Sequence, residues 1–218
     1  MSVLLTYGPS CEPLDEVRFL SNFSTGELGS LLLEELSNYG FDLICLQSRL
    51  TTYCSNSSLA QVIPFTTNDQ LEAALEELSR EKAIRAIFHA AALCDYRVTR
   101  IQTQEDQVLS HRKIPTTLGP LSMTLEPTTK IISKLRFWFP ESILVGWKYE
   151  ADGGEAEALR KAENQLREHQ LTACIANGPA LGEIFQFIAH DGERTLCSSK
   201  RELASFLAKW LHESIVRK

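Results

Sequence analysis

Residues 6–29, TYGPSCEPLDEVRFLSNFSTGELG, bring glycines and hydroxyl side chains together at the expected start of a helix. Gly26 and Gly29 fall in the first turn of the helical pattern, and Ser24 stands just before it. The first N–H groups of a helix lack partners, and the helix dipole is positive at that end. The stretch therefore predicts an anion site of the kind that holds a phosphate.

The glycine spacing separates this site from dinucleotide binding. Gly8 and Gly26 are 18 positions apart, whereas the G-x-G-x-x-G pattern is compact. The apolar run at 43–50, LICLQSRL, also lacks the acidic residue that binds a ribose at the end of such a strand. A nicotinamide-dependent Rossmann oxidoreductase is thus a weaker hypothesis. Glycines that merely turn a loop and cap a helix explain the glycines alone equally well.

A second chemical signal is the run FHAAALCDYRV at 88–98. An apolar strand that ends in alanines lets a ligand approach the backbone closely at Ala91 and Ala92. Asp95 then follows at the carboxyl end, which is where α/β sheets bind their ligands. Taken alone, a tightly packed strand end with Asp95 as a helix cap is the simpler explanation.

Two further strand ends carry groups that suit a nucleobase. The segment LVGWKYEAD at 144–152 presents Trp147, whose ring is able to stack on a base. The segment ACIANGP at 173–179 ends its apolar run at Asn177, whose amide is able to bond one. Core packing is the ordinary role of a tryptophan in such a run.

Strands and helices alternate along most of the chain. Apolar runs predict strands at residues 3–6, 41–46, 86–92, 143–147 and 173–176. Helical spacing of leucines begins at Leu28 and stops near Gly40. Capping boxes predict later helix starts at Thr67 and Ser199, and a charged helix fills 155–170. The order predicts an α/β fold, a Rossmann-like, doubly wound, mainly parallel sheet.

The end of the chain predicts a small antiparallel appendage. Asp191-Gly192 lies between two strand-like runs, which is typical of a hairpin turn. No repeat or linker interrupts the chain, so residues 1–218 are expected to form one domain. Two extended segments, LSMTL at 121–125 and FQFIAH at 185–190, are candidates for pairing across an interface between two copies.

Composition narrows the functional classes. The 218 residues are 44% hydrophobic and 23% charged, with a net charge of -6, so neither disorder nor a general nucleic-acid surface is indicated. No apolar run is long enough for a membrane span, and no signal peptide is evident, so the expected location is the cytoplasm. The six cysteines contain no C-x-x-C pair and indicate reduced thiols; Cys11 and Cys94 are interpreted as packing residues. No metal-binding residues are predicted.

In this order, the segments resemble phosphopantothenoylcysteine synthetase, the phosphopantothenate–cysteine ligase family of coenzyme A biosynthesis. That family shows E-P-[IL]-D-x-V-R-F-[IL]-x-N-x-S-[ST]-G, then A-A-[AV]-x-D-[YF], a K-I segment, a V-G-F-like strand and A-N. The matching segments here are Glu12–Asp15, Val17–Phe19, Asn22–Gly26, Ala90–Tyr96, Lys113-Ile114, Val145–Trp147 and Ala176-Asn177. The resemblance spans nearly the whole chain.

The resemblance implies a role for each matched position. The residues that would hold the nucleotide are Gly8, Ser24, Gly26, Gly29, Trp147 and Asn177. Those that would line the phosphopantothenate site are Asn22, Ala91, Ala92 and Asp95, with Asp95 open between substrate and nucleotide. Arg18 would reach in from a second subunit, and Lys113 would lie on a mobile flap. Asn22 and Lys113 are the implied catalytic residues.

The resemblance also implies the reaction and the partners. The carboxylate of 4′-phosphopantothenate would attack the α-phosphate of CTP or ATP, with Mg²⁺, to form an acyl-nucleotidylate that the amine of cysteine then opens. A homodimer is expected, and no flavin, nucleic acid or membrane is expected as a partner.

Several positions depart from the family pattern. Glu27 stands where Lys or Arg is usual, which places an acid near the expected triphosphate site, and Trp147 replaces Phe. The flap reads KIPTT, and lysines of the bacterial members fall here at about Gln165 and His169. These departures leave open the choice of nucleotide and a catalytically altered, nucleotide-binding paralogue.

Overall fold

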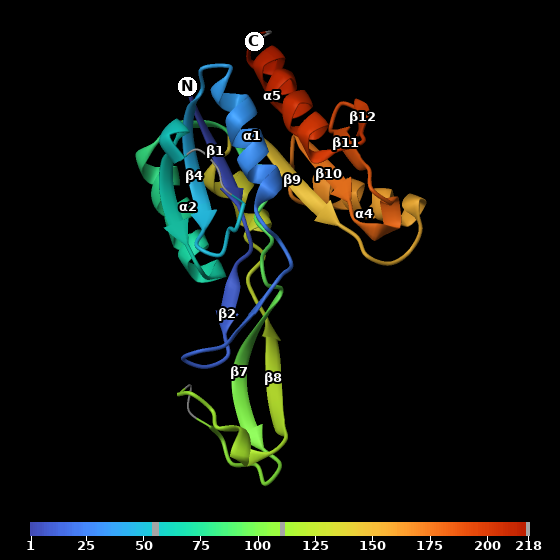
Figure 1. Ribbon diagram of the computed structural model, residues 1–218. Coiled ribbons are helices and arrows are strands. Elements are labelled where there is room, and N and C mark those ends of the chain that lie inside the picture. Colours follow the sequence, from blue (N-terminus) through green and yellow to red (C-terminus); the bar gives the residue numbers. More distant parts are fainter. Residues whose placement is uncertain (54–56, 110–111, 217–218) are drawn as a thin grey trace.

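The alternation of strands and helices produces an eight-stranded sheet with helices on both faces, from which a two-stranded arm projects (Figure 1). The computed structural model describes residues 1–53, 57–109 and 112–216. Among these residues, no helix combines the length and the apolar character that crossing a bilayer requires.

Six strands of the large sheet are parallel and two are antiparallel. The order is β12-β11-β10-β9-β6-β1-β4-β5. The parallel strands are β1 (Ser2–Tyr7), β4 (Asp42–Ser48), β5 (Gln61–Phe65), β6 (Ile84–His89), β9 (Ile143–Tyr149) and β10 (Ala173–Asn177). The antiparallel strands are β11 (Phe185–Ala189) and β12 (Arg194–Cys197). The predicted fold class is confirmed, and the antiparallel hairpin continues the main sheet.

Two helical layers cover the sheet and explain its apolar strands. The helices α1 (Glu27–Ser37) and α5 (Lys200–Val216) pack over one face, and α2 (Asn68–Glu81), α3 (Ile132–Trp138) and α4 (Glu155–Glu168) pack over the other. In β1, Leu5 and Tyr7 face the first layer and Leu4 faces the second; all three are buried. A strand covered on both sides is expected to be apolar throughout.

The hydroxyl half of each predicted capping box is present, whereas the Gln70 and Glu202 side chains accept from the N–H groups of Thr66 and Ser198, one residue before each cap. The Thr67 hydroxyl accepts a hydrogen bond from the backbone N–H of Gln70 at the start of α2, and the Ser199 hydroxyl accepts one from Glu202 at the start of α5. Each satisfies an N–H group that the helix itself leaves unpaired.

The arm is the feature that sequence reasoning missed. It pairs β7 (Tyr96–Thr103) with β8 (Leu121–Pro127), and the short hairpin of β2 (Cys11–Pro13) and β3 (Phe19–Ser21) lies near its base (Figure 1). Only residues 121–125 were expected to be extended. Short 3-10 turns, η1 (Ser57–Leu59), η2 (Thr116–Leu118) and η3 (Pro179–Leu181), complete the described elements.

Two sequence-based expectations are wrong in detail. The strand expected at 86–92 ends at His89, and the backbone beyond it follows residues 8–10 through a bridge between Pro9 and Ala92. The segment 185–190 is not an edge: β11 lies between β10 and β12, so both its edges are already paired within the chain. It therefore cannot add a strand to a second copy.

Candidate active site at the carboxyl edge of the sheet

The parallel strands all end on the same edge of the sheet, and the strand order reverses next to β1. From β1 the chain builds outward through β4 and β5, and then returns to add β6, β9 and β10 on the other side. Loops that leave such a reversal separate from one another, and ligands of open α/β sheets bind in the crevice between them. Most of the predicted site residues lie in these loops.

Gly8 and Gly26 meet on the side chain of Thr51, which belongs to the loop after β4. Both glycines have positive φ angles, 84° and 77°. A Cβ atom at Gly8 would lie 2.2 Å from the Thr51 Oγ1 atom, and one at Gly26 would lie 2.6 Å from its Cγ2 atom. Turn geometry and this contact both require glycine. The Thr51 hydroxyl is buried and has no hydrogen-bond partner among the described residues.

The start of α1 is packed closely against β1. A Cβ at Gly29 would lie 2.2 Å from the Cβ of Tyr7, so this glycine permits close helix–strand packing. At the helix start the Ser24 hydroxyl accepts a long bond from Gly26 N–H (3.4 Å), and the Thr25 hydroxyl accepts one from Glu27 N–H (3.3 Å). Hydrogen bonds of this length are weak, so the N–H groups of Gly26 and Glu27 are available to bind an anion instead.

Asn22 is brought to the strand end that the sequence singled out. Its Nδ2 atom donates to the carbonyl oxygen of Leu93 at 2.7 Å, across 71 positions of the chain. This contact places Asn22 beside the segment that contains Ala91, Ala92 and Asp95. An amide nitrogen has two hydrogens, so the second N–H group and the side-chain oxygen of Asn22 stay available.

Buried polar groups hold the backbone around Cys94 in place. Its carbonyl accepts from Asn68 Nδ2 (2.7 Å) and from the Thr128 hydroxyl (2.6 Å), and its N–H donates to the Ser10 hydroxyl (2.8 Å). Burial raises the pKa of the Cys94 thiol, and also that of Cys11, so both stay protonated at neutral pH. The interpretation of these two cysteines as packing residues agrees with this state.

His89 lies beneath the same strand end. Its Nδ1 atom is 2.8 Å from the Thr6 hydroxyl, and the side chain is almost completely buried. Burial lowers the pKa of His89 to about 4 because the apolar surroundings disfavour the charged ring. His89 is therefore neutral at pH 7 and supports the edge without adding charge.

Trp147 and Asn177 lie on the neighbouring strands β9 and β10 of the same edge. Trp147 is half-buried and packs against the layer that contains α1 and α5. Its Nε1 atom is buried and has no hydrogen-bond partner within the described part of the chain. The carbonyl of Asn177 accepts from Glu150 N–H at 2.9 Å. A small hollow of about 430 Å³ adjoins this strand end and is lined in part by Tyr149, Asn177 and Phe185.

The strand end after Trp147 carries a buried carboxylate between two ammonium groups. Glu150 pairs with Lys148 at 3.1 Å and with Lys161 at 2.6 Å. These two lysines hold the pKa of Glu150 below its usual value, although its desolvation opposes them. Lys161 also pairs with Glu157 at 3.4 Å, so two carboxylates balance the two lysines. Sequence reasoning noted Lys148 and Glu150 but had no signal for Lys161, which approaches from α4.

Two of the departures from the family pattern have structural explanations. Glu27 is paired with Lys200, the first residue of α5, so its negative charge is balanced at the start of α1. Gln165 donates from Nε2 to the carbonyl of Trp147 at 2.9 Å and so supports β9. The described residues give no such side-chain contact for His169, and burial lowers its pKa.

Lys113 and Arg18 lie on the arm, away from the residues collected at the sheet edge. Lys113 is exposed, and among the described residues it has no hydrogen bond or ion pair with the edge group. Arg18 is bound within its own chain, to Asp15 and to the carbonyl of Ile114 (2.9 Å). The structure therefore brings ten of the twelve predicted residues to one edge and leaves these two on the arm.

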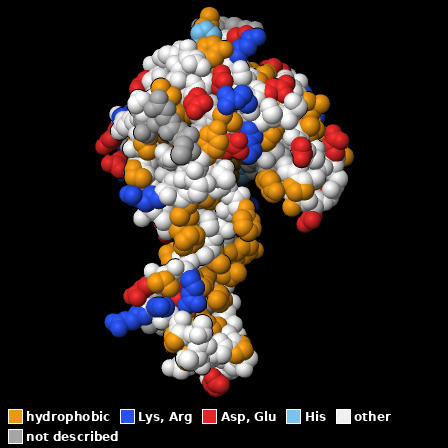
Figure 2. Space-filling view, in the orientation of Figure 1, with side chains coloured by type: hydrophobic (Ala, Val, Ile, Leu, Met, Phe, Trp, Pro, Cys, Tyr) orange, Lys and Arg blue, Asp and Glu red, His pale blue; other side chains and the backbone are white. Residues whose placement is uncertain are grey.

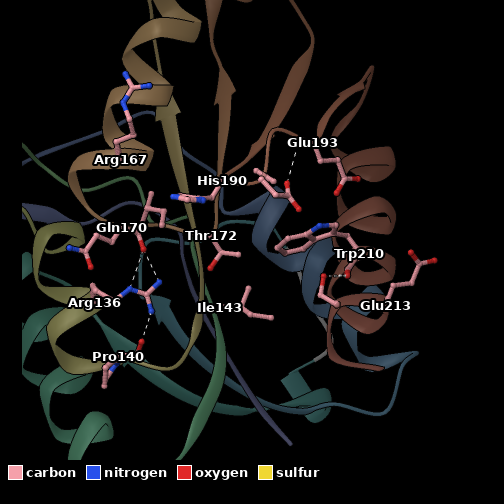
Figure 3. A pocket seen from close by; sticks show the side chains of 14 residues that line it. Arg136, Pro140, Ile143, Arg167, Gln170, Thr172, His190, Glu193, Trp210 and Glu213 are labelled. Atoms are coloured by element: carbon pink, nitrogen blue, oxygen red, sulfur yellow. Dashed lines mark hydrogen bonds between the residues drawn. The ribbon is translucent and has the colours of Figure 1, made fainter. Parts of the chain in front are cut away.

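A hollow of about 1050 Å³ lies at the opposite edge of the sheet (Figure 3). It contains none of the predicted site residues. The guanidinium of Arg136 points toward it but is used internally, because it donates to the carbonyls of Gln170 (2.7 Å), Pro140 (2.8 Å) and Ser142 (3.0 Å). Size alone is a poor guide here, since convergent polar groups distinguish a site, and these gather at the carboxyl edge.

No group of three His, Cys, Asp or Glu side chains that could hold a metal ion is found in the described part of the chain. Mg²⁺ prefers phosphate and water oxygens to protein cages.

Residues 1–214 match the model of a family described as the DNA/pantothenate metabolism flavoprotein C-terminal domain. A coenzyme A biosynthesis bifunctional protein CoaBC of Thermococcus kodakarensis is 30% identical over 177 residues, which are 80% of this chain and 40% of that protein. A phosphopantothenate–cysteine ligase of Mus musculus is 30% identical over 195 residues, 86% of this chain and 58% of that protein. The chain thus spans about half the length of these curated relatives.

A solved structure has the same fold. The DNA/pantothenate metabolism flavoprotein from Streptococcus pneumoniae aligns with a TM-score of 0.86 over 98% of this chain and 99% of that chain, at 23% identity. The sheet with its arm is therefore shared by proteins of quite different sequence.

Proposed function

The chain belongs to the DNA/pantothenate metabolism flavoprotein C-terminal domain family, and from this premise we propose that it is a phosphopantothenate–cysteine ligase of coenzyme A biosynthesis. The observation that carries the proposal is the bond from Asn22 to the carbonyl of Leu93. It joins the N-x-S-T-G loop at the start of α1 to the A-A-x-x-D segment after β6, the two motifs that a nucleotidyl transfer to a carboxylate must bring together.

The proposed nucleotide site extends along the edge from α1 to β10. Gly8, Ser24, Gly26 and Gly29 would cradle phosphates at the helix start, where the N–H groups are weakly bonded and the helix dipole is positive. Trp147 and Asn177 would hold the base. Lys148 and Lys161 lie on that side, where Glu150 and Glu157 pair with them.

The proposed chemistry needs no nucleophilic side chain. A carboxylate oxygen of 4′-phosphopantothenate attacks the α-phosphorus, and the bond to the bridging oxygen breaks as pyrophosphate leaves. The cysteine amine then attacks the acyl carbon, loses a proton and expels the nucleoside monophosphate. The second N–H group of Asn22 is placed to donate to the phosphoryl or carbonyl oxygen on which charge develops in both steps. Mg²⁺ bound to the triphosphate would neutralise charge on the leaving group.

A homodimer is part of the proposal, and it is supported by the surface of the arm and its base. Large apolar side chains are exposed there, and Figure 2 shows them along the stem. They are Val17, Phe19, Tyr96, Met123 and Leu125, each 44–59% exposed. The outer edge of β8 is also unpaired among the described residues. Apolar patches of this kind mark interaction sites. Light scattering at micromolar concentration is expected to give twice the chain mass, with monomer for a Met123→Glu, Leu125→Glu variant.

The alternative is a nucleotide-binding paralogue without turnover. The ion pair between Glu27 and Lys200 favours the active enzyme. Once Glu27 is paired, its negative charge repels a triphosphate less. Nothing at the edge favours a nicotinamide-dependent oxidoreductase. Buried, unpaired thiols at the five described cysteines suit a reducing compartment, so the cytoplasm is the proposed location.

The test is pyrophosphate release with CTP and, separately, with ATP, each in the presence of Mg²⁺. Release that requires phosphopantothenate, together with formation of phosphopantothenoylcysteine by mass spectrometry when cysteine is added, is expected with one nucleotide. Binding of nucleotide without release would indicate the paralogue. Specific stabilisation by NADPH or FMN, but by neither triphosphate, would overturn the proposal.

A further inference from the structure

One buried carboxylate organises the turn between β2 and β3. The Oδ1 atom of Asp15 accepts hydrogen bonds from the backbone N–H groups of Val17 (2.9 Å) and Arg18 (2.8 Å). The Leu14 N–H group donates to the carbonyl of Arg18 at 2.9 Å and closes the turn. The Asp15 side chain has no exposed surface. The Oδ1 atom of Asp15 therefore stabilises the turn itself.

The other oxygen of Asp15 reaches a distant part of the chain. Its Oδ2 atom accepts from Arg18 Nε (3.0 Å) and Nη2, and also from the backbone N–H of Ile114 at 3.2 Å. Arg18 Nη2 in turn donates to the carbonyl of Ile114 at 2.9 Å. Both backbone groups of Ile114 are thus bound by an ion pair that lies almost 100 positions earlier.

The Ile114 side chain is held as firmly as its backbone. It is 5% exposed and forms a small apolar cluster with Val98 and Ile101 of β7, against which Leu14 packs. Lys113, the preceding residue, is exposed and free of partners among the described residues. The backbone that follows Lys113 is therefore held in place, and no contact among the described residues restrains the Lys113 side chain.

We propose that Asp15 is a positioning residue: with Arg18 it clamps Ile114 and thereby sets the region that the Lys113 ammonium can reach. The role of Lys113 itself rests on the proposed function. The same hairpin carries Asn22 four residues beyond Arg18, so the clamp links the arm to the loop that supplies the amide at the sheet edge. Arg18 keeps its Nη1 atom unbonded within the described chain, and its side chain is 43% exposed, which leaves one face for a ligand or a second copy.

The pKa of Asp15 supports the clamp. The Arg18 guanidinium, followed by the backbone N–H donors, holds the pKa of this carboxyl far below its usual range. The clamp is thus charged at every pH at which the enzyme would be assayed.

The Asp15→Asn variant separates the two halves of this carboxylate. Asparagine keeps an oxygen for the Val17 and Arg18 N–H groups and therefore the turn, but its NH₂ group cannot accept from Arg18 or Ile114. Amide hydrogen exchange over residues 112–118 is expected to rise at least tenfold, while the melting temperature changes little. The matched control is Asp69→Asn, which breaks the ion pair of Asp69 with Arg97 (2.7 Å) at the base of the arm and should leave exchange at Ile114 unchanged.

Turnover tests the link to Lys113. Asp15→Asn is expected to lower kcat about tenfold in the wild-type background and less than twofold in the Lys113→Gln background, because a clamp acts only through the group that it positions. An equal loss in both backgrounds would overturn the positioning role, and unchanged exchange at Ile114 would overturn the clamp. Absence of any ligase turnover in the wild type would refute the proposed function and with it the role of Lys113, whereas the exchange experiment would still decide the clamp.

Discussion

The sheet edge and the arm solve the problem of placing a side chain in different ways. At the edge, Asn22 and the glycine loops are backed by two buried helical layers and by a network of buried polar groups around Cys94. On the arm, Lys113 depends on one ion pair and on a cluster built from three buried side chains. The edge is positioned by packing, and the arm by a few specific contacts.

This difference has a consequence for function. Close packing gives a fixed geometry, which suits the groups that stabilise a developing charge. A projection with few contacts is the kind of region that opens locally at low cost, which suits the mobile role proposed for Lys113. The following predictions test this division, from the largest expected effect to the smallest.

The first prediction compares the effect of Asn22 variants on turnover with their effect on nucleotide affinity. Asn22→Asp is expected to lower turnover by ~10² to 10³, since it replaces a preorganised donor by a negative charge that faces phosphates. Asn22→Ala should be comparably slow. Nucleotide affinity should change much less, because the helix start remains. Pyrophosphate release is the measurement. Near-normal turnover in both variants, or loss that only follows a lowered melting temperature, would show that Asn22 merely ties the loop to Leu93.

The second prediction tests how tightly the edge is packed. Gly26→Ala must adopt a positive φ and also meets the Thr51 side chain, at 2.6 Å, so a destabilisation of about 3 kcal/mol is expected from strain and overpacking. Gly40→Ala is the control, because Gly40 has a similar φ of 72° but open space around it; about 1 kcal/mol is expected. Urea unfolding measures both. Equal losses of unfolding free energy in the two variants would mean that the Thr51 side chain moves aside at little cost and that the edge is loosely packed.

The third prediction is that the sheet edge and the arm respond differently to pH. The pKa of His89 is about 4 in the folded chain and about 6.5 when unfolded. The unfolded chain thus binds more protons between these values, so stability is complete above pH 6.5 and falls toward pH 4. The loss from pH 7 to pH 5 is about 2 kcal/mol.

Denaturant unfolding at the two pH values checks this loss. His89→Gln should show a smaller difference between them, whereas His212→Gln, at an exposed position, should behave as the wild type. The clamp at Asp15 should stay intact over the same range, because the pKa of that carboxyl is strongly lowered. Exchange at Ile114 that rises in step with the loss of core stability at pH 5 would contradict the separation.

The fourth prediction concerns charge at the mouth of the site. Lys200→Gln leaves Glu27 unpaired near the proposed triphosphate, so the KM for nucleotide is expected to rise about threefold to fivefold, in line with an exposed pair worth at most about 1 kcal/mol. The effect should shrink in 0.5 M salt, which screens it. A Glu27→Gln, Lys200→Gln double variant should recover most of the loss. No recovery would mean that Lys200 acts on the nucleotide independently of Glu27.

The sequence predicted the edge better than the arm for a physical reason. Strands buried on both faces are continuous apolar runs, and helix starts carry local capping signals, as at Thr67 and Ser199. The arm strands are exposed over much of their length, and in the dimer proposed above a second copy would cover part of them. Their pattern within one chain is therefore weak, and only residues 121–125 were expected to be extended.

Local chemistry explains which parts of the site were found. The motifs around Asn22 and Asp95 could be identified because each lies within a short stretch with its own turn and strand signals. Thr51, Lys161 and Lys200 carry no such signal, since each acts through a partner that is distant in sequence. From the sequence alone, Glu27 looked unfavourable for triphosphate binding, because its partner Lys200 on α5 could not be identified.

The sequence by itself determined the layered α/β fold, the family and the loops that carry the chemistry, because these depend on periodicity and on motifs within a few residues of each other. The tertiary structure alone decided what fills the space beside Gly8 and Gly26, what balances Glu27 and what fixes Ile114. These are contacts between segments far apart in the chain, from Thr51 to Gly8, from Lys200 to Glu27 and from Asp15 to Ile114. Such contacts arise only when packing has placed the segments, so no local pattern encodes them.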